Sequence, residues 1–222
     1  MKRLLLTAGI LAASLLAFVG CDTNLGINTV RGSGAINAHT INATDFTGLN
    51  ISGAYEVTFR QADHFTVILE IQDNLMNYVE ASVINGVLHV SGSRNFSTTW
   101  DNTPHLRVYA PYLDNLRTSG AVDAYLHLDV DTLEINTSGA ADVRLEGSAN
   151  TLEIRTSGAS NIEAFYFIAS DVTVSVSGAG EVEVHATNTL DARITGAGRV
   201  TYDGNPSVSR SVSGAGIIRS RH

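Results

Sequence analysis

The chain is short of cysteine, lysine and proline. Among its 222 residues there is one cysteine, Cys21, one lysine, Lys2, and three prolines. A lone cysteine cannot form an internal disulfide, and it cannot supply the paired thiolates of a zinc ribbon. The formal charge of −8 argues against the basic surface that nucleic-acid binding requires. These shortages set aside disulfide scaffolds, cysteine-rich zinc domains and nucleic-acid-binding proteins.

Long apolar runs are absent except for one at the N-terminus, Leu4 to Val19. About 16 apolar or small residues fall short of the roughly 20 that a membrane-spanning helix needs. The basic residues 2–3 precede the run, and the small Gly20 follows it. This order predicts a signal peptide over residues 1–20. A permanent transmembrane helix is the alternative, but the run is followed by the polar, non-basic residues 22–24.

The cysteine directly after this run predicts a lipid attachment. Residues 17–21 read Ala-Phe-Val-Gly-Cys and resemble a bacterial lipobox, with Phe18 where leucine is usual. In that motif cleavage occurs before the cysteine, here Cys21, whose thiol carries a diacylglycerol. Each buried CH₂ of an acyl chain contributes about 0.8 kcal/mol of membrane affinity. We therefore expect an anchor at Cys21, in the outer rather than the inner membrane, and a tether over residues 21–31. An ordinary signal peptide is the alternative.

The rest of the chain repeats a Ser/Thr-Gly-Ala unit, whose glycines are spaced by 19, 19, 20, 18 and 18 residues. Its copies are Ser119-Gly120-Ala121, Ser138-Gly139-Ala140, Ser157-Gly158-Ala159, Ser177-Gly178-Ala179, Thr195-Gly196-Ala197 and Ser213-Gly214-Ala215. Two earlier copies, at Gly34 and Gly53, are also 19 residues apart. Near-constant spacing over this many copies indicates a stack of similar units.

Apolar and polar residues alternate around each glycine, as in half-buried strands. Four residues before it stand Leu116, Ile135, Ile154, Val174 and Ala192, and four after it stand Ala124, Val143, Ile162, Val182, Val200 and Ile218. Two strands meeting at a glycine corner, with rungs ~4.8 Å apart, predict an all-β, right-handed parallel β-helix or solenoid of about 18–20 residues per rung. The glycine is required if the corner has φ > 0, or if a side chain there would collide with the next rung.

The segment from about residue 54 to 117 breaks the repeat. Asn85-Gly86 stands between apolar runs and predicts a β-hairpin. Asp73 is a candidate cap for a short helical turn. We therefore expect antiparallel hairpin elements in the N-terminal half, within a single domain over 32–222 whose regular rungs cover about 118–218. In the last copy Arg210 takes the apolar position, which predicts that it caps the C-terminal end of the core.

Two outward columns contain candidate chemistry. One consists of Asp123, Asp142, Asn161, Glu181 and Arg199, and the other of Glu134, Glu153 and Asp191 beside Asn136, Arg155 and Arg193. The first could form a cation- or sugar-binding ladder, but turn hydrogen bonds to backbone amides are the favoured interpretation. The second could cleave polysaccharides through paired carboxylates, although a solvated strand face has the same composition.

No other pattern in the sequence indicates catalysis or metal binding. The histidines His39, His64, His89, His105, His127, His185 and His222 lack the close spacing of metal ligands. We predict no catalytic residues, no metal and no cofactor. The aromatic residues Tyr109, Tyr112, Tyr125, Phe165, Tyr166 and Phe167 would favour sugar binding if they formed an exposed cluster.

An ordered set of short motifs resembles one known family. After the lipoprotein signal come Arg31-Gly32-Ser33-Gly34, residues 46–53, Val57-Thr58-Phe59-Arg60-Gln61, residues 70–75, Asn85-Gly86-Val87-Leu88 and the serial Ser-Gly-Ala units. This set, over about residues 31–222, resembles the head GIN domain family, which is labelled as autotransporter adhesins. The resemblance implies a right-handed β-helical envelope protein and supplies no catalytic residues.

The expected function is therefore that of a non-catalytic bacterial cell-envelope lipoprotein that presents a β-solenoid surface for adhesion or envelope interactions. Its expected partners are membrane lipid through Cys21 and a cell-surface glycan or protein, with no nucleic acid. The alternative is a carbohydrate-binding or polysaccharide-cleaving β-helix protein.

Overall fold

The computed structural model describes residues 29–98 and 102–222 as an all-β protein with mixed sheets. The signal peptide and Cys21 lie outside the described residues, as does Trp100. Within the described ranges the only helix is α1 (Asp73–Met76), and none is long and apolar enough to cross a membrane. The all-β prediction is confirmed.

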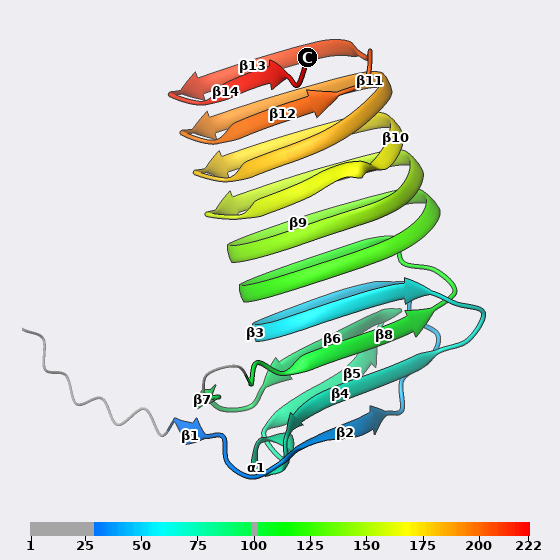
Figure 1. Ribbon diagram of the computed structural model, residues 1–222, viewed down its shortest axis with the longest axis vertical. Helices are drawn as coiled ribbons and strands as arrows, with labels where there is room; N and C mark the ends of the chain where they lie inside the picture. Colours follow the sequence, from blue (N-terminus) through cyan, green and yellow to red (C-terminus); the bar gives the residue numbers. More distant parts are fainter. Residues whose placement is uncertain (1–28, 99–101) are drawn as a thin grey trace, which may run out of the picture.

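Strands of successive repeats pair in parallel and are stacked one above another along the long axis of the molecule (Figure 1). From base to top they are β3 (Gly48–Gln61), β9 (Asn115–Gly158), β10 (Asn161–Gly178), β11 (Glu181–Gly196), β12 (Arg199–Asp203), β13 (Ser207–Gly214) and β14 (Ile217–Ser220). Repeat glycines pair with one another: Gly178 with both Gly158 and Gly196, and Gly196 with Gly214. We call each unit around one such corner glycine a rung.

Both reasons for a glycine at the corner hold: the backbone there has a positive φ, and a side chain would collide with the rung below. Gly139 has φ 103°, a conformation that side chains rarely adopt. A Cβ built on Gly139 would also lie 2.6 Å from the carbonyl oxygen of Gly120, the corner of the rung below. Rung spacing therefore leaves no room for a side chain at the corner.

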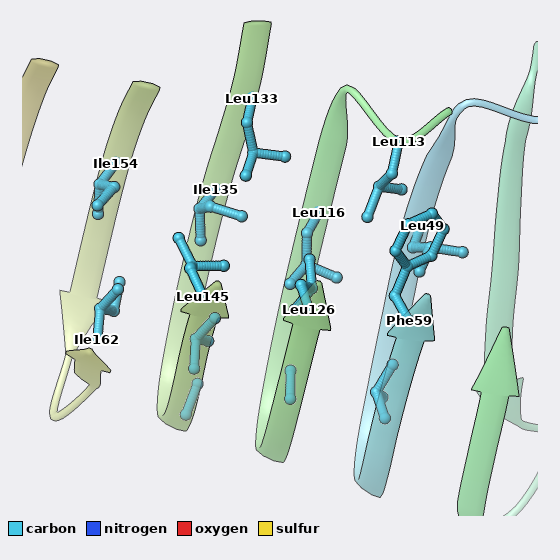
Figure 2. Close-up of a cluster of buried hydrophobic side chains, with 14 of the residues drawn as sticks. Leu49, Phe59, Leu113, Leu116, Leu126, Leu133, Ile135, Leu145, Ile154 and Ile162 are labelled. Carbon is cyan, nitrogen blue, oxygen red and sulfur yellow. The ribbon is translucent and has the colours of Figure 1, made fainter. Parts of the chain in front are cut away.

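The inward residues form continuous apolar columns. Leu116, Ile135 and Ile154 are fully buried, each in a successive rung, and Figure 2 shows them between the two walls of the stack. Ile162 and Leu145 face them from the strands after the corner. The predicted inside-outside register is confirmed.

The base of the stack is built out of sequence order. Gly53 pairs with Gly120, so β3 lies directly beside the first rung of β9 although the two glycines are 67 positions apart in the sequence. On its other edge β3 pairs in parallel with β6 (Val87–Gly92) and β8 (His105–Ala110). Residues 54–61, which the sequence assigns to the irregular section, are part of β3.

Three antiparallel strands complete the base. They are β5 (Val79–Ile84) beside β6, β4 (Thr66–Gln72) beside β8, and β2 (Ile36–Ile41) beside β4. A separate two-residue pair joins β1 (Val30–Arg31) to β7 (Phe96–Ser97). The predicted hairpin is confirmed, because Asn85 and Gly86 both have positive φ and join β5 to β6. Asp73 does not cap a helix as predicted; it is the first residue of α1, whose N-cap is Gln72.

The C-terminal end is closed only in part. Arg210 is exposed on β13, in the last rung, as predicted. However, Val208 and Val212, which flank it on the same inward face, remain 37% and 44% exposed. One arginine stem is too narrow to cover both valines, so the end of the apolar core is accessible.

Candidate binding face

The outward residues of the strands before each corner form three polar columns. We call this surface the serine face. Nearest the corner stand Ser52, Ser119, Ser138, Ser157, Ser177, Thr195 and Ser213; the next column has Asn50, Arg117, Asn136, Arg155, Ser175, Arg193 and Ser211; the third has Asn115, Glu134, Glu153, Thr173, Asp191 and Ser209. Parallel pairing in register aligns like residues one rung apart.

A groove of about 470 Å³ runs along this face. Its outward lining consists of Asn50, Arg117, Ser119, Asn136, Ser138, Arg155, Ser157, Ser175 and Ser177. Small serine side chains form its floor beside the glycine corners, and longer arginine and asparagine side chains stand next to them. The groove crosses several rungs, so an extended ligand could contact several of them at once.

Many groups in the groove have unused hydrogen-bonding capacity. Ser119 donates to Ser52 over 3.0 Å, but Ser157 and Ser177 make no side-chain hydrogen bond within the described ranges. Arg117 is exposed and has no ion pair within 4.0 Å in the same part of the chain. These hydroxyls and this guanidinium are free to bind a ligand with many oxygens.

A fixed polar network borders the groove. Arg155 donates to Glu134 over 2.7 Å and also pairs with Glu153. Glu134 accepts further hydrogen bonds from Asn136 over 2.9 Å and Asn115 over 3.0 Å. The bond from Asn136, with the nearby charges of Arg155 and Arg117, lowers the pKa of Glu134 below its ordinary value.

This network bears on the polysaccharide-cleavage hypothesis. A glycosidase needs one carboxyl whose pKa is raised, so that it can donate a proton to the leaving group. Glu134 is shifted in the opposite direction, and Glu153 is held in an ion pair with Arg155. In this column Glu134 and Glu153 are thus engaged by Arg155 and the neighbouring asparagines at the edge of the groove.

The column of Asp123, Asp142, Asn161, Glu181 and Arg199 lies on the opposite outward face, in strands and not in turns. The prediction of turn hydrogen bonds to backbone amides is wrong, because all five residues lie in strands; Glu181 and Arg199 pair with each other across rungs, and Asp123 faces Arg144 of the next rung. Arg144 donates to Glu163 over 3.2 Å and lies 3.9 Å from Asp123, and Arg199 pairs with Glu181 over 2.9 Å.

The candidate aromatic residues do not form a single exposed platform. Phe167 is fully buried, whereas Tyr166 beside it is 80% exposed at a bulge between Glu163 and Ile168. This bulge accommodates the one spacing of 20 residues. Tyr112 is 66% exposed on the connection between β8 and β9. No group of three metal-ligating side chains occurs in residues 29–98 and 102–222.

Sequence reasoning missed the serine column as part of a site. The serines marked the repeat, but nothing local indicates that they would form the floor of a groove. Their constant place beside the corner glycine, always on the outward side of the alternation, is the signal that could have identified them.

The fold and the serine face together define the class of protein: an all-β protein of stacked, parallel-paired rungs that displays regular polar columns. Residues 45–206 match the family model described as "Putative auto-transporter adhesin, head GIN domain". The chain therefore belongs to the head GIN domain family, as its sequence motifs predicted. No curated protein matches it.

Three solved structures with a similar fold come from Bacteroides and Parabacteroides species. A putative adhesin from Bacteroides fragilis superimposes with a TM-score of 0.70 at 21% identity, covering 86% of this chain and 99% of its own. A putative lipid binding protein from Parabacteroides distasonis has a TM-score of 0.53 at 20% identity, covering 87% and 100%. A putative adhesin from Parabacteroides merdae has a TM-score of 0.53 at 19% identity, covering 87% and 99%. At these identities the likeness concerns the fold.

Proposed function

We propose that the chain is a non-catalytic cell-envelope lipoprotein, anchored through an acylated Cys21, that presents a right-handed parallel β-solenoid for adhesion. Parallel pairing of successive rungs in register supports the solenoid, and the strong preference of parallel crossovers supports the hand. The family description supports a role at the cell surface.

The observation that carries the adhesive role is the groove of the serine face. A multi-rung groove with free hydroxyls and an unpaired guanidinium suits an extended, oxygen-rich ligand such as a glycan chain. Binding would be multivalent along the groove, because each rung offers similar donors at regular intervals.

Glycan-array binding of the purified chain tests this role, with an arm of lipid vesicles. Arg117→Ala combined with Ser157→Tyr removes the free charge and fills the groove. The matched control is Arg144→Ala, which removes an arginine from the opposite face. We expect the groove variant to lose at least about tenfold in affinity. Equal binding by both variants would overturn the assignment of the groove, and release of shortened glycans would overturn the non-catalytic role.

A further inference from the structure

A second cavity lies on the outward face opposite the serine face, near the C-terminal end of the stack. It is partly open, has a volume of about 450 Å³ and crosses β10, β11, β12 and β14, which are successive levels of the upper stack (Figure 1). This volume falls within the range of small-molecule sites. The lining residues, polar or charged except for one phenylalanine, are Phe165, Glu183, Thr201, Arg219, Ser220 and Arg221.

Three of these residues form one column. Glu183 of β11 pairs with Thr201 of β12, and Thr201 pairs with Arg219 of β14. All three face outward, because the residue before each of them is buried in the core. In-register parallel pairing therefore places a carboxylate, a hydroxyl and a guanidinium in a line, at intervals of ~4.8 Å along the stack.

The hydroxyl in the middle of this column has no hydrogen-bond partner. Thr201 faces outward and yet is only 5% exposed, so the side chains around the cavity enclose it. Its Oγ1 is buried and makes no hydrogen bond in the described part of the chain. A buried hydroxyl without a partner is destabilising, and buried side-chain hydroxyls are seldom left so. A ligand in the cavity would supply the missing hydrogen bond.

The two ends of the column are also without partners. Within residues 29–98 and 102–222, Glu183 makes no hydrogen bond or ion pair and Arg219 makes no ion pair. Burial, together with the charges of Glu163 and Glu181, raises the pKa of Glu183 above its ordinary value. Glu163 and Glu181 themselves each have an arginine partner. The cavity thus offers a free acceptor at one end and a free cation at the other.

Arg221 forms a fixed wall of the cavity. Its guanidinium donates to Asp203 over 3.2 Å and lies 4.5 Å from the centre of the Phe165 ring. Phe165 is on β10 and Arg221 follows β14, so this contact bridges the two strands between them. The ion pair and the ring hold the guanidinium in place, and its remaining N–H donors are available to a ligand.

The three groups of the column together select the chemistry of a ligand. A guanidinium binds a carboxylate through two parallel hydrogen bonds, which suits Arg219. Glu183 needs donors and would repel a second anionic group, so hydroxyls suit that end better than another carboxylate or a phosphate. We propose that this cavity binds a hydroxylated carboxylate, either the acidic sugar at the end of a glycan or a free sugar acid. The site is separate from the serine face and does not depend on what that face binds.

Calorimetric titration of the chain, isolated in mild detergent, tests the ligand class. The probes are methyl glucuronide for the glycan end, gluconate for the free sugar acid, and methyl glucoside as the neutral counterpart of the glucuronide. We expect at least one of the two acids to bind at least about tenfold more tightly than the glucoside, because only an acid pairs with Arg219. The acid that binds more tightly identifies the source. Equal affinity for all three probes, or no saturable binding of either acid, would overturn the proposal.

Two substitutions test the site itself. Arg219→Gln removes the free cation, and Thr201→Val replaces the hydroxyl with a methyl group of similar shape. The matched control is Arg210→Gln, which removes an exposed arginine of the last rung outside the cavity. We expect each cavity variant to bind the preferred acid at least about tenfold more weakly, and the control to bind it as the unmodified chain does.

Thermal melting separates binding from folding. Thr201→Val should melt at the same temperature as the unmodified chain or higher, because it removes a buried hydroxyl that has no partner. Loss of affinity without loss of stability therefore assigns the hydroxyl to binding. Unchanged affinity in both cavity variants, or an equal loss in Arg210→Gln, would overturn the site.

Discussion

The side chain of Val176 fills the space that a side chain at Gly198 would need inside the corner of the stack. A Cβ on Gly198 would lie 2.5 Å from Cγ1 of Val176 in the rung below. The same relationship joins Ile194 to Gly216, while Thr137, a smaller residue, donates a hydrogen bond to Ser160 over 2.9 Å. Val176 and Ile194, the large aliphatic residues of the lower rung, each face a glycine in the rung above. The size of the side chain in the lower rung therefore limits the size of the residue above it.

Gly198→Ala should therefore destabilise the protein by about 2 kcal/mol, because the added methyl overpacks a filled corner. Urea unfolding followed by circular dichroism measures the loss. Gly180→Ala is the matched control, since its Cβ would lie 3.2 Å from a methyl of Thr156 that can shift. Equal losses for the two variants would contradict this account of the corner.

Ile154→Asp should prevent folding, whereas Glu153→Ala should change stability by no more than about 1 kcal/mol. Ile154 is fully buried, and an unpaired carboxylate there costs several kcal/mol, comparable with the stability of a whole domain. Glu153 is half-buried on the outward side, in an ion pair of modest value. Thermal melts of both variants provide the comparison, and similar midpoints would refute the register.

Stability should fall in acid partly through Glu134. Its folded-state pKa lies below the ordinary value of 4.5, chiefly because Asn136 donates to the carboxylate. The stabilisation is complete at pH values above 4.5 and is lost as the pH falls through the lowered pKa. Glu134→Gln should therefore flatten the stability profile on the acid side of pH 4.5. An unchanged slope in urea titrations at several pH values would argue against a shifted carboxyl.

Cys21 should carry acyl chains in the protein extracted from membranes. The prediction rests on the short apolar run that ends at Gly20 and on the absence of any other cysteine. Intact mass spectrometry should show a chain that begins at Cys21 with the added mass of a diacylglycerol and a further acyl group. An unmodified Cys21, or a different mature N-terminus, would exclude the anchor.

The inward columns could be predicted from the sequence because alternation along a strand is local. Ile154 and Glu153 are neighbours on opposite faces, and a period of two residues places every second side chain inside. The corner glycines were predictable for a similar reason, since a constant spacing places them one above another. The Asn85-Gly86 turn also depends only on the conformations of two adjacent residues.

Only the tertiary structure decided how distant segments meet. No local pattern indicates that Gly53 lies beside Gly120, because the chain after β3 first builds the base strands on one edge of β3 and then returns to pair with its other edge through β9. The groove, the sharing of Glu134 by Arg155, Asn136 and Asn115, and the incomplete cover that Arg210 provides depend on distances between rungs. The alternation of apolar and polar residues acts within one strand and determines which of its side chains face the core. Which strands pair, and which side chains meet across rungs, depends instead on the strand edges that the rest of the fold leaves unpaired.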